Sequence, residues 1–391
     1  MINLTQLYLG ETSSSDDRQD ASGDQDPFGS DAERKPMVVW NITRRCNLRC
    51  VHCYSDSEPR GYSGELDFRE CKAVIDDLAR FGVPAILLSG GEPLTHPDFF
   101  AIARYASERG LRLTLSTNGT LLRRATAYSL RAIGFSYVGI SLDGIGETHD
   151  TFRGRQGAFE GAMTAFRNCQ RVGQKAGFRL TLTSHTIDHL NEILDFIEAE
   201  DIPRVCFDHL VFSGRGAGLQ LVDPLRVRAA MDLILNRITS WQSQGVTREV
   251  LTVDQPADAV YIYLRLCQEN PQRAEEVLQF MKGNGGSANG SGIGLGNIDS
   301  GGSVHPDQFW QAHYLGNVRE KPFSRIWTES QDDLLLGLRH HLSRLRGRCA
   351  ECQYLSACGG GLRVRAAQFH NDPWAPDPGC YLTSEEALGH N

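Results

Sequence analysis

The sequence predicts an α/β fold in which strands and helices alternate along the first half of the chain and a small cysteine-rich domain follows. Two observations support this prediction. Between residues 36 and about 220, short apolar runs alternate with helix-like stretches, and seven of the 11 cysteines fall into two ordered groups, one near each end of the chain. Strand and helix patterns that alternate in this way are typical of βαβ units around a parallel sheet.

The expected elements follow in order after Pro36, where the ordered chain is predicted to begin. Residues 1–35 are rich in Ser, Asp, Gln and Gly and are expected to be disordered. Six strands are expected at residues 38–42, 85–88, 112–119, 137–144, 178–184 and 205–212, separated by helices at 68–81, 97–109, 121–133, 158–172 and 190–199. Two more helices, at 224–244 and 257–282, make residues 221–285 a helical linker region, and residues 286–391 form the C-terminal domain.

A run dominated by glycine, serine and asparagine separates the linker region from this last domain. It extends from residue 283 to residue 302. One interpretation is a flexible linker. However, Ile293, Leu295 and Ile298 interrupt the run, and residues 304–307 close it like the end of a hairpin. Because a glycine-rich backbone can approach a ligand closely, a position near a cofactor or substrate is the alternative.

Composition excludes several classes of protein. A formal charge of −8 without an evident basic patch argues against nucleic-acid binding. No stretch approaches the roughly 18 apolar residues of a membrane-spanning helix, and no secretory signal opens the chain. We therefore expect a cytoplasmic protein without a membrane or nucleic-acid partner, in which ordered cysteines indicate metal binding rather than disulfides. The scattered cysteines are expected to be small buried apolar residues; they are Cys71, Cys169, Cys206 and Cys267.

The first cysteine group is Cys46, Cys50 and Cys53, in C-x3-C-x2-C spacing directly after the first expected strand. A four-iron cluster normally takes four thiolates, so three thiolates leave one iron open. An open coordination position is what distinguishes a catalytic metal site from a closed structural one. The alternative is a zinc site completed by His52, although a tight loop would have difficulty bringing all four donors onto one ion.

This spacing resembles the defining motif of the radical S-adenosylmethionine (SAM) superfamily, which lies in the loop after the first strand of a partial parallel barrel. The resemblance implies a partial (β/α)6 parallel barrel for the core, residues 36–220. It also implies that the three thiolates hold a 4Fe-4S cluster whose open iron chelates the amino and carboxylate groups of SAM. His52 then occupies the aromatic position that packs near the adenine.

Further segments match SAM contacts of this superfamily. Residues 89–93 resemble its GGEP motif, whose glycine and glutamate region holds the methionine amino group, and polar strand ends are expected to line the site. Ser141 and Asp143 match positions that bind the ribose, with strand-end capping as the alternative. Arg153 matches an arginine that pairs with the SAM carboxylate. The expected SAM-binding residues are His52, Gly90, Gly91, Glu92, Pro93, Thr117, Asn118, Ser141, Asp143 and Arg153.

The second cysteine group supplies four thiolates, enough for a saturated 4Fe-4S cluster or for a structural zinc. It comprises Cys349, Cys352 and Cys358 in C-x2-C-x5-C spacing, with Cys380 downstream. This pattern resembles the SPASM extension of radical SAM enzymes, which in its full form carries two auxiliary clusters. The chain departs from the full form because Leu362 stands where another cysteine is expected and the glycine-rich hairpin has none. The resemblance therefore implies one auxiliary 4Fe-4S cluster, and two clusters in total.

Over nearly the full length after residue 35, the pattern resembles the NirJ family of haem d1 biosynthesis, most closely at residues 294–299 and 304–310. That resemblance implies removal of propionate side chains from a didecarboxysirohaem-type iron tetrapyrrole by a 5'-deoxyadenosyl radical, with an electron donor such as a flavodoxin or ferredoxin. Two alternatives remain: another SPASM-type enzyme, either a haem-propionate decarboxylase of the sirohaem-dependent route or a peptide maturase, and a non-catalytic zinc-binding protein.

Substrate-binding residues are harder to assign from sequence. Arg215, Arg363 and Arg365 are candidate cations for the substrate carboxylates, but the sequence alone does not place them. His305 is a candidate axial ligand to the substrate iron, since imidazole binds iron well. An ordinary turn histidine before Pro306 is the favoured alternative.

Overall fold

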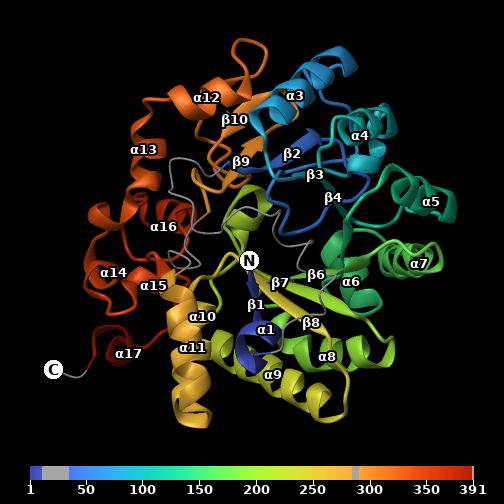
Figure 1. Ribbon diagram of the computed structural model, residues 1–391. Helices are drawn as coiled ribbons and strands as arrows, with labels where there is room; N and C mark the ends of the chain where they lie inside the picture. The colour runs from blue at the N-terminus through green and yellow to red at the C-terminus, as the bar shows by residue number, and fades with distance from the viewer. Residues whose placement is uncertain (11–34, 284–289, 390–391) are drawn as a thin grey trace.

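The computed structural model describes residues 1–10, 35–283 and 290–389 of the chain. An eleven-stranded sheet runs in the order β1-β8-β7-β6-β5-β4-β3-β2-β9-β10-β11 (Figure 1). The six expected strands are confirmed as parallel neighbours in chain order. They are β2 (Met37–Thr43), β3 (Ile86–Gly90), β4 (Leu113–Thr117), β5 (Tyr137–Ser141), β6 (Ala176–Leu182) and β7 (Arg204–His209).

Helices cover the outer face of this parallel sheet, as βαβ connections require. Each turns an apolar face inward; in α3 that face includes Cys71, Val74, Ile75 and Leu78. The start of α3 is fixed by a capping box in which Asp67 and Glu70 each accept a hydrogen bond from the other's backbone N–H. The outer helices are α3 (Phe68–Phe81), α4 (Phe99–Glu108), α5 (Arg124–Ile133), α7 (Ala158–Arg171) and α8 (Leu190–Ala199).

Two parallel strands that the sequence analysis did not predict extend the sheet at either side. β8 (Glu249–Val253) pairs with β7, so the region 221–285 contains a strand as well as α9 (Pro224–Ser243), α10 (Ala257–Glu269) and α11 (Pro271–Gly283). β9 (Leu295–Ile298) pairs with β2 on the opposite side. Because β8 and β9 do not pair with each other, the barrel stays open.

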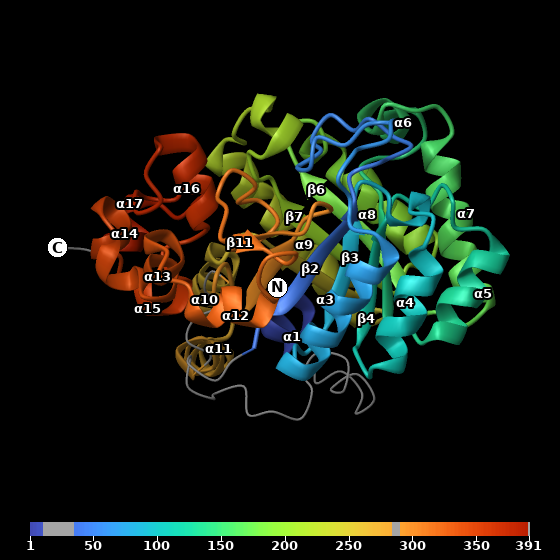
Figure 2. The same cartoon turned by 90° about the horizontal axis from the view of Figure 1, so that it is seen from above.

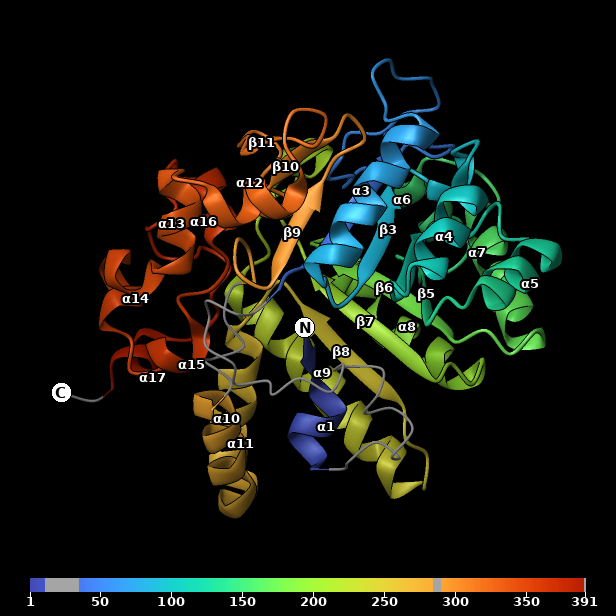
Figure 3. The same cartoon turned by 45° about the horizontal axis from the view of Figure 1, so that its top comes forward.

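The prediction of disorder is wrong for residues 1–10. They form β1 (Ile2–Asn3), which pairs antiparallel with β8, and α1 (Leu4–Leu9), which lies beside β8 and α9 (Figure 3). Leu4, Leu7 and Tyr8 are buried there, and the Thr5 hydroxyl donates to the Arg248 carbonyl over 2.8 Å. Burial of these apolar side chains offsets part of the conformational entropy that residues 1–10 lose on ordering. The rest of the segment predicted to be disordered, residues 11–34, lies outside the described residues.

The glycine-rich run contains sheet structure rather than serving only as a linker. Residues 284–289 lie outside the described residues, but β9 and β10 (Ser303–His305) form an antiparallel hairpin, and β11 (Gly316–Asn317) pairs with β10. A Cβ on Gly296 would lie 2.8 Å from the Trp327 ring, which explains why β9 requires a glycine at that position.

Short helices make up the remainder of the chain. α13 to α17 gather at one side of the barrel, away from α4, α5 and α7 (Figure 2). Within the described ranges, no helix combines the length and apolar character needed to cross a membrane. The short helices are α12 (Phe323–Glu329), α13 (Asp333–Arg339), α14 (Gly347–Glu351), α15 (Leu355–Cys358), α16 (Arg363–His370) and α17 (Ser384–Leu388).

Candidate active site and auxiliary cysteine site

A cavity of about 1100 Å³, partly open to solvent, lies at the carboxyl ends of the parallel strands. This is the edge at which ligand sites form in parallel α/β sheets. Ten predicted site residues line it: Cys46, Cys50, His52, Cys53, Gly90, Gly91, Thr117, Asn118, Ser141 and Arg153. Three of the predicted SAM-binding residues, Glu92, Pro93 and Asp143, do not line it, and neither does the substrate candidate His305.

Donors surround the three thiols of the first cysteine group. The Leu48 N–H lies 3.4 Å from the Cys46 sulfur, the Ser57 N–H lies 3.4 Å from that of Cys53, and the Arg153 guanidinium lies 3.6 Å from that of Cys50. Burial raises the pKa of Cys46 to about 12 and also raises the pKa of Cys50. Ionisation of these thiols therefore needs a cationic partner, which a bound iron cluster supplies.

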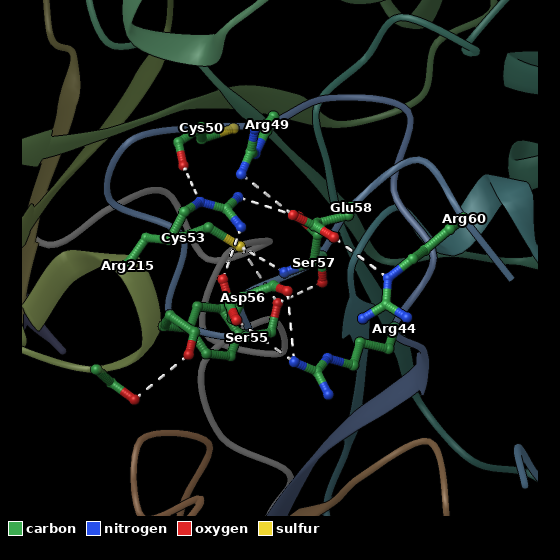
Figure 4. Close-up of polar contacts among 12 residues, drawn as sticks. Arg44, Arg49, Cys50, Cys53, Ser55, Asp56, Ser57, Glu58, Arg60 and Arg215 are labelled. Carbon is green, nitrogen blue, oxygen red and sulfur yellow. Dashed lines mark hydrogen bonds and ion pairs between the residues drawn. The ribbon is translucent and has the colours of Figure 1, made fainter. Parts of the chain in front are cut away.

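One arginine fixes the shape of the cysteine loop, residues 44–60 (Figure 4). The Arg215 Nε donates to the Cys50 carbonyl over 2.8 Å, Nη1 to an Asp56 carboxylate oxygen over 2.9 Å and Nη2 to the Ser57 carbonyl over 3.0 Å. The Arg215 N–H also donates to the Cys53 carbonyl. Arg215 thus holds the loop, and the loop engages all three nitrogens of its guanidinium.

The Gly-Gly-Glu-Pro turn after β3 packs directly on the start of the cysteine loop. The Gly91 N–H donates to the Thr43 carbonyl over 2.8 Å, and the Glu92 N–H donates to the Arg45 carbonyl over 2.9 Å. A Cβ would lie only 2.3 Å from the Thr43 oxygen at Gly90, and 2.3 Å from the Arg45 oxygen at Gly91. The glycines therefore allow two backbone segments to touch, a requirement separate from any approach to a ligand.

Glu92 lies behind the cavity wall and joins β3 to β4. It is fully buried, and its carboxylate accepts hydrogen bonds from the Thr117 hydroxyl and the Asn118 N–H, both over 2.8 Å, and from the Leu94 N–H over 3.2 Å. Burial raises its pKa to about 7 despite these donors. Its position makes it a positioning residue for Thr117 and Asn118, which do line the cavity.

Asp143 and Arg153 form a buried ion pair beside Cys50. The other Asp143 oxygen accepts the Thr181 N–H over 2.8 Å, and although burial opposes its ionisation, Arg153 holds the pKa of Asp143 below its usual value. Asp143 therefore lies behind Arg153 rather than on the cavity surface. Arg153 lines the cavity, and its Nε has no hydrogen-bond partner among the described residues.

Comparison with known proteins assigns this arrangement to a family. The model of the Radical SAM superfamily matches residues 40–197, which run from β2 into α8 and include the cysteine loop, the GGEP turn and Arg153. The chain belongs to the radical SAM superfamily. It is therefore an enzyme whose cofactors include a 4Fe-4S cluster and SAM.

Two relatives align with this radical SAM enzyme over most of their length. An "Fe-coproporphyrin III synthase" of Methanosarcina barkeri is 46% identical over 99% of the chain and 98% of the relative. A "Pre-heme d1 synthase" of Dinoroseobacter shibae is 43% identical over 90% of the chain and 87% of the relative.

Two solved structures with bound cofactor share the fold of this radical SAM enzyme. "Native anSMEcpe with bound AdoMet" gives a TM-score of 0.67 at 18% identity, covering 88% of this chain and 94% of the other. Streptococcus suis SuiB bound to S-adenosylmethionine gives 0.68 at 17% identity, covering 89% and 78%. At this identity the likeness shows the fold alone.

The second cysteine group of this radical SAM enzyme surrounds a separate cavity of about 380 Å³. Cys349, Cys352, Cys358 and Cys380 all line it, and burial raises the pKa of the last three. In the described part of the chain, no three His, Cys, Asp or Glu side chains converge tightly enough to hold one metal ion. Four cysteines are enough for a saturated four-iron cluster or for a structural zinc site.

The other residues suggested for substrate binding are engaged inside the protein. His305 is buried on β10, with Nδ1 2.6 Å from the His313 carbonyl and Nε2 3.5 Å from an Asp299 oxygen, so the structure favours a structural histidine over an iron ligand. Arg363 donates to the Pro373 and Ala375 carbonyls. Arg365 forms a bidentate pair with Asp377, both contacts 2.7 Å.

Sequence reasoning missed the residues that line the cavity from β6, β7 and β8. Arg179 pairs with Asp208 through contacts of 3.2 and 3.0 Å. Asp254 follows β8 and lines the cavity, and burial raises its pKa to about 7. His209 closes β7. Asp254 follows a strand and His209 ends one, a signal that the sequence analysis used for β4 and β5 only, whereas Arg179 lies within β6.

Proposed function

We propose that this radical SAM enzyme acts in haem d1 biosynthesis, removing propionate side chains from a didecarboxysirohaem-type iron tetrapyrrole. The observation that carries the proposal is the 43% identity, over 90% of the chain, to a protein named pre-heme d1 synthase. The cavity supports it, because apolar side chains such as Leu87, Leu210 and Phe309 contribute to its walls.

A second candidate function is the formation of Fe-coproporphyrin III from a related precursor. The 46% identity to an Fe-coproporphyrin III synthase, over 99% of this chain, favours it. Both candidates place an iron tetrapyrrole in the same cavity and differ in the side chains that are altered. A peptide substrate, the remaining alternative among SPASM-type enzymes, has no comparable support from these two relatives.

We further propose two 4Fe-4S clusters and a SPASM-like C-terminal domain. Cys46, Cys50 and Cys53 would hold the cluster that binds SAM, and the second cysteine group would hold one auxiliary cluster. Four thiolates saturate such a cluster, which suits electron transfer rather than substrate binding. An external donor such as a flavodoxin or ferredoxin would supply the electron.

The residues around the first cluster have distinct roles in this proposal. When bound, the cluster and SAM supply a 5'-deoxyadenosyl radical that takes a hydrogen atom from the substrate side chain. Arg153, which lines the cavity, would pair with the SAM carboxylate, and Asp143 orients Arg153 from behind. The His52 ring stacks on Phe152, with centroids 4.6 Å apart, and would pack against the adenine. Ser141 would bind the ribose.

The backbone of the turn after β3 is the surface available to the methionine amino group. Gly90, Gly91 and the side chains of Thr117 and Asn118 line that part of the cavity. Glu92 fixes Thr117 and Asn118 by accepting a hydrogen bond from each. Pro93 begins the short 3-10 helix that follows and holds the turn in place.

Anaerobic incubation of the reconstituted protein with SAM, a reductant and didecarboxysirohaem tests the proposal. Mass spectrometry is expected to show 5'-deoxyadenosine together with loss of propionate mass. Formation of Fe-coproporphyrin III would select the second candidate, and 5'-deoxyadenosine with unaltered tetrapyrrole would reject both substrates. Cys50→Ala is expected to abolish the reaction, whereas the matched control Cys267→Ala, an exposed cysteine outside both groups, is not.

A further inference from the structure

One histidine in the large cavity has a ring nitrogen that the protein leaves free. His209 lies at the carboxyl end of β7, is 6% exposed and lines the same cavity as the three cysteines. Its Nε2 lies 3.1 Å from an Asp258 oxygen. Its Nδ1 has no hydrogen-bond partner among the residues that the structure describes.

The surroundings of Asp258 fix which nitrogen of this histidine carries the proton. Asp258 is fully buried, and its other oxygen accepts the Tyr381 hydroxyl over 2.8 Å. An ionised carboxylate can only accept hydrogen bonds, so in this contact the Nε2–H of His209 donates to Asp258. Nδ1 is then the nitrogen with the lone pair. A carboxylate that orients a histidine through its second nitrogen is the usual support of a metal-binding imidazole.

The other histidines near the cavity differ from His209 in position or in hydrogen bonding, although the buried Nδ1 of His52 also has no partner among the described residues. The described histidines that line it are His52 and His209. His52 lies between two cysteines and stacks on Phe152, on the side of the first cluster. His149 accepts the Asp143 N–H at its Nδ1. His305, suggested by the sequence, has partners at both nitrogens.

The neighbours of His209 suit a flat, largely apolar ligand that carries a metal. Leu210 and Val211 follow it in the chain, and Phe309 approaches from the C-terminal part; all three line the cavity. The Arg179 charge is balanced by Asp208. Asp254 and Gln308 also line the cavity, and the buried Gln308 Oε1 has no hydrogen-bond partner among the described residues.

From these contacts we propose that His209 binds the iron of a tetrapyrrole substrate through Nδ1, and so positions the ring in the cavity. The inference rests on the proposed function, because it requires an iron tetrapyrrole as substrate. Imidazole is a common axial ligand of tetrapyrrole iron. Asp258 and Tyr381 are positioning residues that act through His209.

Binding of ferric coproporphyrin III and of metal-free coproporphyrin III to the anaerobic, cluster-loaded full chain tests this inference. The wild-type protein is expected to give the absorption and electron paramagnetic resonance signature of an imidazole-bound iron. His209→Ala is expected to lose that signature and regain it with added imidazole, while its affinity for the metal-free ring stays within about twofold. Asp258→Asn is expected to weaken binding of the iron compound by about 10- to 100-fold. His305→Ala is the control and is expected to keep the signature.

Each other outcome has a distinct meaning. An imidazole signature that persists in His209→Ala overturns the inference, as does an equal loss of affinity for both rings, which indicates a role in cavity shape alone. The inference is also overturned if the signature disappears in Asp254→Asn but persists in His209→Ala, because the iron then depends on Asp254 and not on His209. If the wild-type protein binds neither ring, the proposed function fails and the inference fails with it.

Discussion

Loss of the Asp143 charge is predicted to destabilise the fold strongly, because it leaves a buried cation without a partner. The Asp143 side chain is fully buried and that of Arg153 is 9% exposed. Removing one member of such a pair costs about 3 to 5 kcal/mol, since the remaining charge is no longer compensated. Asp143→Asn keeps an oxygen for the Thr181 N–H, so this charge effect should account for its loss of unfolding free energy. Asp143→Ala should lose about 1 to 3 kcal/mol more, because that N–H then lacks an acceptor.

Anaerobic denaturant titration of the variants measures these differences. The double variant Asp143→Asn, Arg153→Met is expected to recover most of the loss, because no buried charge remains. Arg44→Met is the matched control: its pair with Asp56 spans 3.6 Å between side chains that are 44% and 51% exposed, so its loss should stay below about 1 kcal/mol. A loss for Asp143→Asn no larger than that of the control would refute the reasoning, as would a double variant as unstable as the sum of its parts.

Three more predictions concern the cavity, the turn after β3 and the second cysteine group. The pKa of Asp254 is about 7 in the folded state and 3.8 ordinarily, so folding takes up a proton between these values. The free energy of unfolding therefore falls as pH rises from about 4 to about 7. Denaturant midpoints measured between pH 5.5 and 8.5 should fall less for Asp254→Asn than for the wild-type protein. Gly91→Ala should reduce the iron content by about half, because its Cβ would lie 2.3 Å from the Arg45 carbonyl oxygen of the cysteine loop. Gly61→Ala is the control, since its Cβ would have no atom within 4 Å, and should keep the full iron content. Equal iron content in the two variants would contradict the packing argument. Cys358→Ala should leave about four irons and keep the SAM-dependent spectral change, with Cys267→Ala as control; unchanged iron would exclude a cluster at that site.

The sequence predicted the parts of the fold that local pattern encodes. Strands such as β3, with Ile86 and Leu88 buried and a turn directly after it, combine an apolar run with a clear end signal. β9 was missed because its glycine-rich sequence has low intrinsic strand propensity, and packing against Trp327 and pairing with β2 override that propensity. α1 was missed because a polar segment follows a helix of only six residues.

The same distinction between local pattern and tertiary contact applies to the residues of the candidate site. Motif residues such as Cys46 and Gly91 were placed in the cavity as expected, because their spacing in the chain is local. The partners that depend on tertiary structure were not predictable: Arg215 reaches back to Cys50 across 165 positions, and His209 contacts Asp258 across 49. His305, which the sequence analysis named as a candidate iron ligand but interpreted more readily as a turn histidine, carries no feature that distinguishes it from His209 until both sets of contacts are known.

The central claim is that Cys46, Cys50 and Cys53 hold an iron-sulfur cluster that binds and cleaves SAM. Electron paramagnetic resonance of the reduced, anaerobically reconstituted protein, recorded with and without SAM and combined with iron and sulfide analysis, tests it most directly. We expect about eight irons and eight sulfides per chain and a cluster signal that changes when SAM is added. Zinc without sulfide, or a cluster signal that SAM leaves unaltered, would contradict it.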